Sequence, residues 1–219
     1  MLAWLSAGLL ARVLYRWRLH EIALPVRDIG VGYALCLAGG AIAGAWLAGS
    51  LNTGLTHPSH SIAGALAGGI VAVELWKAAR GVTESTGVIW VGPLALGIAV
   101  GRIGCFLAGL SDMTYGVPTS LPWGVDLGDG IPRHPVQLYE SAAMLAFLAV
   151  YLVALARQAP WTRARAFYVF VLVYAAQRFV WEFLKPYPRV LGQLDVFQLL
   201  GLVMIGYALL FYARDRRAL

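Results

Sequence analysis

GRIGCFLAGLSDMTYGVPTSLPWGVDLGDGIPRHPVQLYES, residues 101–141, is the stretch from which both a fold and a site can be inferred. It leaves an apolar segment that contains Arg102, crosses a loop rich in Gly and Pro, and enters the next apolar segment through His134-Pro-Val-Gln-Leu-Tyr-Glu140. Ionisable groups at the edge of membrane-spanning segments are costly and usually mark a functional site. The stretch therefore predicts two neighbouring membrane helices with polar chemistry where they meet the loop.

Composition places the whole chain in a membrane. Of the 219 residues 60% are hydrophobic and 13% are charged, and the mean hydropathy is +0.71. A water-soluble domain of this length does not need so much apolar surface, so we expect one polytopic membrane domain over residues 1–219. The net charge of +6 is spread over short gaps between apolar segments, and without a basic stripe it does not indicate nucleic-acid binding.

Six apolar segments each come close to the ~20 residues that a helix needs to cross a bilayer. They lack the period-two alternation of barrel strands, so we expect an all-α integral membrane fold. Residues 1–15 predict either a short, partly inserted seventh helix or an amphipathic helix on the membrane surface. The six expected spans are residues 28–49, 61–77, 87–108, 136–156, 165–184 and 194–213.

Small residues are dense in the first two of these spans. Gly39-Gly40 lies in one and residues 64–69, GALAGG, lie in the other. Small side chains let helix backbones approach closely in lipid, so we expect a tight structural contact here.

The basic residues predict the orientation of the chain. Most of the 17 Lys and Arg residues fall in connections on one side of a single up-and-down threading. By the positive-inside rule this side is cytoplasmic, with the carboxyl terminus, while loops 50–60, 109–135 and 185–193 face outward. The residues on the basic side are Arg12, Arg16, Arg18, Arg27, Lys77, Arg80, Arg157, Arg163, Arg165, Arg214, Arg216 and Arg217.

A polar stripe runs along the fifth expected span. Tyr174, Arg178 and Glu182 are spaced i, i+4, i+8 and therefore share one helix face. This face either carries an internal ion pair or lines a polar cavity for an anionic substrate. Arg102, a second arginine within a span, favours an anion held between two guanidinium groups, and a phosphate suits their planar geometry.

The histidines of the outer loops leave several alternatives open. His57 and His60 could each serve as a general base or lie at the interface without a chemical role. Their spacing does not indicate a metal site, since no Cys or acidic residue accompanies them. His134 is expected to form a cap or loop hydrogen bond, and Cys105 within its span is expected to be a free thiol.

The chain resembles the prolipoprotein diacylglyceryl transferases of bacterial inner membranes. The resemblance covers roughly residues 30–213. It is carried by Gly101-Arg102-Ile103-Gly104-x-Phe106, by Pro132-Arg133-His134-Pro135-x-Gln137-Leu138-Tyr139-Glu140, and by Tyr174-x-x-x-Arg178-Phe179-x-x-Glu182-Phe183.

The resemblance implies a seven-helix enzyme, and we expect it to use no cofactor or metal. It would move the diacylglyceryl group of phosphatidylglycerol to the thiol of a lipobox cysteine in a preprolipoprotein, with glycerol phosphate leaving. The implied catalytic residues are His60 as base (with His57 as the fallback), Arg102 and Arg178 at the phosphate, and Tyr174 and Glu182 supporting Arg178. The resemblance also implies that Arg102 and Arg178 bind the substrate phosphate and that Gln137, Tyr139 and Glu140 hold the loop and the lipid head group. We add His134 and Cys105 to the candidate substrate-binding residues because they lie beside these groups in the sequence.

The sequence also departs from the family pattern beside Arg102. The family usually reads GRxGNFxNGE, whereas this chain has Cys105, Ala108 and Leu110 at the two Asn positions and the Glu position. Asp112 is an alternative source of the acid, displaced by two residues. Three alternatives to the usual reaction therefore remain: a related enzyme with another acceptor, a lipid-binding protein without catalysis, and a transporter, the last disfavoured because no inverted repeat is evident.

Overall fold

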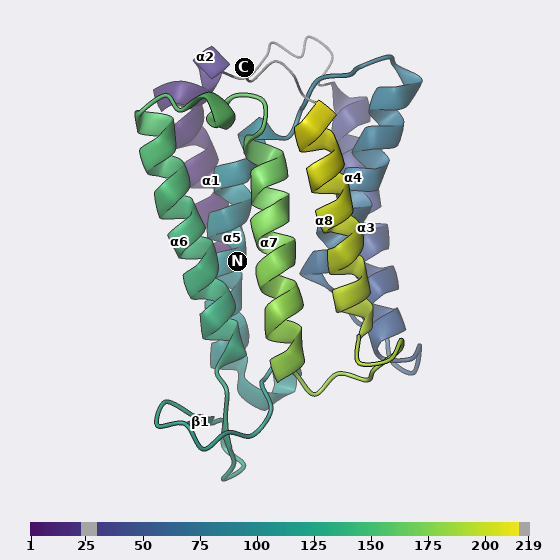
Figure 1. Cartoon of the computed structure of the whole chain (residues 1–219), viewed down its shortest axis with the longest axis vertical. Coiled ribbons are helices and arrows are strands. Elements are labelled where there is room, and N and C mark those ends of the chain that lie inside the picture. The colour runs from purple at the N-terminus through teal and green to yellow at the C-terminus, as the bar shows by residue number, and fades with distance from the viewer. Residues whose placement is uncertain (23–29, 215–219) are drawn as a thin grey trace.

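Helices run side by side along most of the chain in a computed structural model that describes residues 1–22 and 30–214 (Figure 1). Their bounds are α1 Leu2–Leu14, α2 His20–Ile22, α3 Val31–Asn52, α4 Ile62–Ala79, α5 Val91–Ala108, α6 Val136–Ala156, α7 Ala166–Trp181 and α8 Val196–Arg214.

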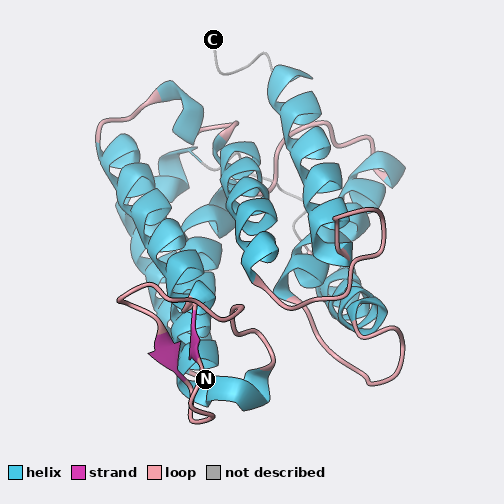
Figure 2. Ribbon diagram, turned by 60° about the horizontal axis from the view of Figure 1, so that its bottom comes forward, coloured by secondary structure: helices cyan, strands magenta, loops and turns pink. Residues whose placement is uncertain are grey.

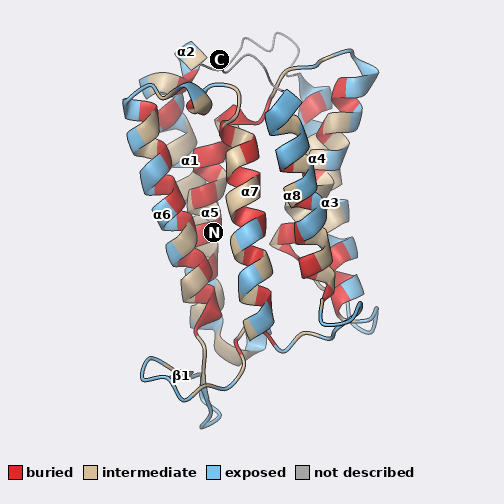
Figure 3. Cartoon of the chain, in the orientation of Figure 1, coloured by how far each residue is buried: buried red, intermediate tan, exposed pale blue. Residues whose placement is uncertain are grey.

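Six helices in the described part of the chain are long and apolar enough to cross a membrane, namely α3 to α8. They start and end within four residues of the predicted spans. Large apolar residues such as Leu35, Leu75 and Val203 are exposed. Exposed residues recur along the helices of the bundle (Figure 3). Apolar exposed faces with all backbone groups bonded within helices suit a lipid environment. The prediction of an all-α integral membrane protein is confirmed.

The amino-terminal segment forms a helix that packs on the bundle. Helix α1 runs antiparallel to α5, so that Ala7 faces Gly97 and Leu14 faces Gly92. A π-helical turn, Tyr15–Leu19, joins α1 to α2. Of the two predictions for residues 1–15, the packing along α5 favours a helix inserted beside the bundle over one that lies on the membrane surface.

Helices α3 and α4 meet through glycine. Gly40 and Gly44 of α3 face Gly64 and Gly68 of α4 so closely that a Cβ atom at any of the four positions would meet the backbone of the other helix. Glycines four residues apart on both partners allow this contact without any side chain between the helices. The close packing predicted from the small residues is therefore present, and we call it the glycine seam.

The connections after α3, α5 and α7 gather at one end of the bundle (Figure 1). The longest holds a 3-10 turn, Gly109–Asp112, and a short antiparallel hairpin of β1 Val125–Asp126 and β2 Pro132–Arg133 (Figure 2). Val117 N donates to Leu184 O at 2.7 Å and ties this loop to the end of α7. Twelve basic residues were expected on the opposite, cytoplasmic side. Those that the structure describes lie toward the other end of the bundle, while Arg27, Arg216 and Arg217 lie outside the described residues.

Candidate functional site

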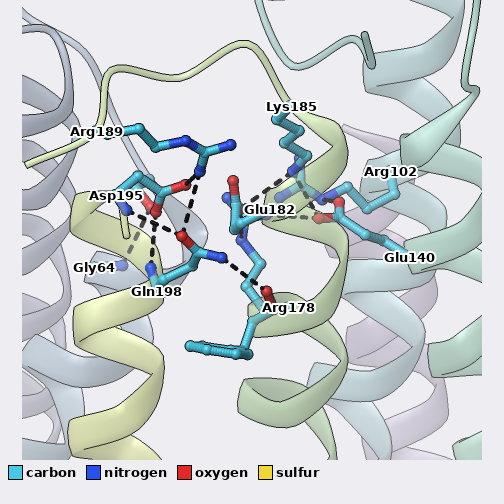
Figure 4. A network of polar contacts seen from close by, with 11 residues as sticks. Gly64, Arg102, Glu140, Arg178, Glu182, Lys185, Arg189, Asp195 and Gln198 are labelled. Atoms are coloured by element: carbon cyan, nitrogen blue, oxygen red, sulfur yellow. Dashed lines mark hydrogen bonds and ion pairs between the residues drawn. The ribbon is translucent and has the colours of Figure 1, made fainter. Parts of the chain in front are cut away.

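Five charged side chains from α5, α6, α7 and the turn after α7 converge on one another (Figure 4), at the end of the bundle that carries the hairpin. Arg102 comes from the last turns of α5, Glu140 from the second turn of α6 and Arg178 from the last turn of α7, while Glu182 and Lys185 lie just beyond α7. None of the five residues is more than 4% exposed. We call these five residues the charged cluster.

Glu140 is the centre of the charged cluster. Its Oε2 lies 2.5 Å from Arg102 Nε, and its Oε1 accepts from Arg178 Nη1 at 3.0 Å and from Lys185 Nζ at 2.7 Å. One carboxylate thus joins α5, α6 and the end of α7.

Glu182 supplies the second carboxylate. Its Oε1 lies 2.5 Å from Arg178 Nε and 3.3 Å from Lys185 Nζ. The contacts of Arg102 with Glu140 and of Arg178 with Glu182 are ion pairs by distance, without the alignment of a hydrogen bond. These guanidinium groups therefore keep N–H directions that the carboxylates do not use.

The charges of the cluster do not cancel. Three cations face two carboxylates, so the five side chains together carry one positive charge when all are ionised. Removing one partner of a buried ion pair costs about 3–5 kcal/mol because the remaining charge is uncompensated. A monoanion would bring the cluster to neutrality, and a phosphodiester is a monoanion with oxygens that suit guanidinium groups.

Polar side chains from the same helix faces surround the cluster. The buried Tyr174 hydroxyl, one turn before Arg178, interacts electrostatically with both arginines and both glutamates. Gln137, one turn before Glu140, is fully buried, and its amide makes no hydrogen bond to any described residue. Ser141 donates to Ala99 O at 2.9 Å and fixes α6 against α5.

The remaining residues of the HPVQLYE motif form an aromatic group beside the cluster. The Tyr139 hydroxyl accepts from Trp123 Nε1 at 2.8 Å and lies 3.4 Å from His134 Nδ1. The Tyr139 ring packs on the Trp181 ring with centroids 5.3 Å apart. His134 and Tyr139 thus connect the outer loop to α6 and α7, which agrees with a loop hydrogen bond for His134.

Cys105 lies one turn beyond Arg102 and is a free thiol. It interacts electrostatically with Arg102 and with Asp112. Asp112 accepts from Thr114 Oγ1 and has no ion pair with the cluster within the described chain. The displaced acid considered from the sequence therefore lies near Cys105.

The structure does not bring the outer-loop histidines into contact with the cluster. His57 and His60 are both exposed, and no hydrogen bond or ion pair joins either to the five charged residues within the described ranges. His60 precedes Ser61, which caps α4 by accepting from Gly64 N at 3.3 Å. The structure thus brings Arg102, Arg178, Glu182 and Tyr174 together, whereas His60 stands apart from them.

Sequence reasoning missed Lys185, which it counted only as an outer-loop basic residue. Burial, followed by the neighbouring Arg178, lowers the pKa of its ammonium group. The signal that could have found it is the i, i+3 spacing of Glu182 and Lys185 at the end of a polar helix face.

A second missed group fixes α8 beside the cluster. Asp195 Oδ1 accepts from Gln198 N at 2.8 Å, Gln198 Oε1 accepts from Asp195 N at 3.0 Å, and Arg189 Nη1 lies 3.2 Å from Asp195 Oδ2. This is a reciprocal cap at the start of α8, and its Asp-x-x-Gln spacing is visible in the sequence. Gln198 Nε2 also donates to Phe179 O at 3.3 Å, which ties the cap to α7. Within residues 1–22 and 30–214, no group of three or more His, Cys, Asp or Glu side chains could hold a metal ion.

Comparison with known proteins agrees with the motifs. The family model of the prolipoprotein diacylglyceryl transferases matches residues 53–214. Curated proteins named phosphatidylglycerol–prolipoprotein diacylglyceryl transferase are similar to this chain, and three of them illustrate the extent of the similarity. The protein of Cupriavidus pinatubonensis is 37% identical over 56% of this chain and 46% of its own length. The protein of Nitratidesulfovibrio vulgaris is 35% identical over 74% of this chain and 63% of its own length. The protein of an Azoarcus species is 33% identical over 75% of this chain and 68% of its own length.

The chain spans about half the length of the first of these curated relatives. No solved structure matches it significantly. The family match covers the segments that supply the charged cluster and its surroundings, from Arg102 to Lys185. On these grounds the chain belongs to the prolipoprotein diacylglyceryl transferase family.

Proposed function

We propose that the chain is a transferase that moves a diacylglyceryl group from phosphatidylglycerol to the thiol of a lipobox cysteine in a preprolipoprotein. The observation that carries the proposal is the charged cluster with its single excess positive charge, buried at one end of an apolar bundle. The phosphodiester of phosphatidylglycerol is a monoanion held at the membrane surface, so it matches the cluster in charge and depth.

The reaction is a displacement at a carbon of the lipid glycerol. The cysteine sulfur forms a bond to this carbon, the carbon–oxygen bond to the phosphate breaks, and the electron pair leaves with glycerol phosphate. The thiol proton passes to a base. Negative charge thus grows on the phosphate in the transition state.

Arg102 and Arg178 are the groups that meet this charge. In a site of low dielectric, one donor positioned for a developing oxyanion typically contributes about 10²- to 10³-fold to kcat. Glu140 and Glu182 hold the guanidinium groups in place before the lipid arrives, so little reorganisation is needed during the reaction. Tyr174 supports Arg178 from one turn away.

We assign the base to His60, at the start of α4, by the family resemblance, with His57 as the alternative. Both side chains are exposed, which suits a base that must receive its proton from a second substrate arriving at the surface. Replacing each by Asn separates the two assignments, because only the loss of the base lowers kcat.

The site would face the extracytoplasmic side of a bacterial inner membrane, with the carboxyl terminus in the cytoplasm. The concentration of basic residues at the opposite end of the bundle supports this orientation. Cysteine labelling at Gly128 and at Gly81, both in exposed turns at opposite ends, tests it in intact cells.

The test of function is rescue of a strain depleted of its own diacylglyceryl transferase, with the lipidated product identified by mass spectrometry. We expect the wild-type chain to rescue, and Arg102→Gln and Arg178→Gln to lower transfer by about 10²-fold or more while both proteins still insert. Arg157→Gln, at an exposed position by the end of α6, is the matched control. Activity in either cluster variant would contradict the phosphate-binding role.

One observation favours a second candidate, a related enzyme with another acceptor. Cys105, Ala108 and Leu110 replace family polar residues close to Arg102, so the surroundings of the first arginine are less polar than the family pattern predicts. Consumption of phosphatidylglycerol without lipidation of a lipobox peptide would favour this candidate. Binding of the lipid without consumption would favour a protein that binds lipid and does not catalyse transfer.

A further inference from the structure

A second polar group lies on the neighbouring face of α7, next to the charged cluster and free of charge. The amide oxygen and nitrogen of Gln177 and the indole nitrogen of Trp181 are buried without a hydrogen-bond partner among the residues that the structure describes. A buried polar group left unpaired costs about 1–3 kcal/mol. Three such atoms on two residues of one helix indicate a site that binds a polar partner.

These atoms come from one short strip of the protein. Gln177 and Trp181 are spaced i, i+4 on α7, so their side chains are neighbours. The Trp181 ring packs on Tyr139 of α6, which places the strip on the side of α7 that faces α6. The Tyr139 hydroxyl is already bonded to Trp123 of the outer loop, so this edge of the strip is fixed.

The strip runs parallel to the charged cluster at the same depth. Gln177 immediately precedes Arg178, and Trp181 immediately precedes Glu182. Consecutive helix residues point about 100° apart, so each neutral group lies beside a charged one around the helix. A ligand whose phosphate sits at Arg178 therefore has its next atoms within reach of Gln177.

We propose that Gln177 and Trp181 form a neutral subsite for the hydroxyl groups of the lipid's glycerol head group; this inference rests on the proposed use of a phosphatidylglycerol-like donor. A hydroxyl both donates and accepts a hydrogen bond. Gln177 offers two donors and one acceptor, and Trp181 offers one donor. Both groups of the strip are uncharged, which suits the hydroxyl groups of a polyol head group. The Trp181 and Tyr139 rings provide apolar faces for the carbon atoms between the hydroxyls.

The decisive experiment compares two lipids that differ only in these hydroxyls. Phosphatidylglycerol and phosphatidylpropanol share the phosphodiester and the acyl chains, but the propanol head group has no free hydroxyl. Affinity is measured for the purified full chain in detergent by displacement of a fluorescent anionic lipid, and transfer to a lipobox peptide is measured in parallel.

We expect the wild-type chain to bind phosphatidylglycerol about tenfold more tightly than phosphatidylpropanol, and Gln177→Leu and Trp181→Phe each to reduce this preference toward unity. Affinity for phosphatidylpropanol should stay unchanged, since neither variant alters a group that contacts the phosphate. Gln193→Leu, which removes an amide from an exposed outer turn, is the matched control and should keep the preference. Two variants are used so that a folding defect in one leaves the other informative.

The inference is overturned if wild type shows no preference, or if both variants keep it or weaken both lipids equally. The proposed function can fail independently of this inference. Binding with the expected preference but without transfer would contradict the proposed transferase activity and support the subsite. Transfer that proceeds while both variants keep the preference for phosphatidylglycerol would support the transferase activity and contradict the subsite.

Discussion

The glycine seam between α3 and α4 and the charged cluster between α5, α6 and α7 hold helices together in opposite ways. In the seam, Gly44 and Gly68 bring two backbones into direct contact, and no side chain intervenes. In the cluster, Glu140 joins three segments through buried cations. Lipid tails are as apolar as leucine, so helices in a membrane associate through close packing or polar contacts rather than through hydrophobic burial.

The difference separates stability from function. Contact between glycines leaves no group that could bind a ligand, so its effect is confined to packing. The cluster pairs three cations with two carboxylates and is thus incompletely neutralised, which makes it a weak choice for stability alone. Substitutions in the first region should therefore change folding, and substitutions in the second should change lipid binding and transfer.

The largest effect is expected for Gly68→Leu, which places a branched side chain against the Gly40 carbonyl and the Gly44 backbone. Overpacking costs about 1–3 kcal/mol where side chains can adjust, and here backbone must move, so we expect most of the protein to lose its folded state. The fraction that elutes as a monomer in mild detergent measures it. Gly39→Leu on the lipid-facing side of α3, with nothing within 4 Å, is the matched control. Equal behaviour of the two variants would show that the seam is not a structural contact.

Both regions could be found from the sequence to different extents. The small residues at 64–69 predicted a close helix contact, because small side chains in a membrane helix mainly allow a neighbouring helix to approach. A functional site was predicted from Arg102, Arg178 and Glu182, because charged residues are rare within an apolar span. The ends of the six membrane-spanning helices could be predicted from hydropathy to within four residues.

The partners within the site could not be predicted, because the sequence does not report which residues meet across helices. The sequence indicated Glu140 as a substrate-binding residue, but it did not indicate that Glu140 pairs with Arg102, Arg178 and Lys185 at the centre of the cluster. Lys185 lies past the end of the apolar segment and looked like a loop residue, although it is 1% exposed. The Asp195 cap was visible as a local motif, but its link to α7 through Gln198 depends on tertiary packing.

A smaller effect is expected for Lys185→Met, which removes the excess charge of the cluster. Hydrogen bonds to charged groups contribute about 1.5–3 kcal/mol, so we expect the affinity for phosphatidylglycerol to fall about 10- to 100-fold. Lys77→Met is the matched control, because Lys77 is also buried and paired with a carboxylate, Glu74 at 3.0 Å, but lies near the other end of the bundle. It should cost stability and leave lipid affinity unchanged. A similar loss of affinity in both variants would mean that a buried lysine matters only for folding.

The pH dependence sharpens the same comparison. Burial lowers the pKa of Lys185 below its ordinary value of 10.5, so the folded protein releases this proton at lower pH than the unfolded chain. Transfer should therefore fall as pH rises through the lowered pKa. Stability should rise over the same window, up to about 10.5, because the unfolded state binds more protons there. Lys185→Arg keeps its charge and should move the fall in transfer to higher pH; an unchanged profile would show that another group titrates.

The smallest effect is expected at an exposed ion pair of the outer hairpin. This pair joins an arginine to a carboxylate, as in the charged cluster, but it is in contact with water. Asp129 Oδ1 accepts from Arg133 Nη1 at 2.6 Å in the outer hairpin, and this hydrogen bond lowers the pKa of the Asp129 carboxyl. A depressed folded pKa gives a contribution to stability that is present above the ordinary value of 3.8 and is lost as pH falls through the folded pKa. Asp129→Asn should thus lower the unfolding midpoint slightly at pH 7, should not lower it at a pH below the folded pKa, and should leave transfer unchanged. Since exposed ion pairs contribute little in a high dielectric, the same charges affect binding only where lipid and protein exclude water. A loss of transfer in Asp129→Asn as large as that in Lys185→Met would mean that the hairpin belongs to the site.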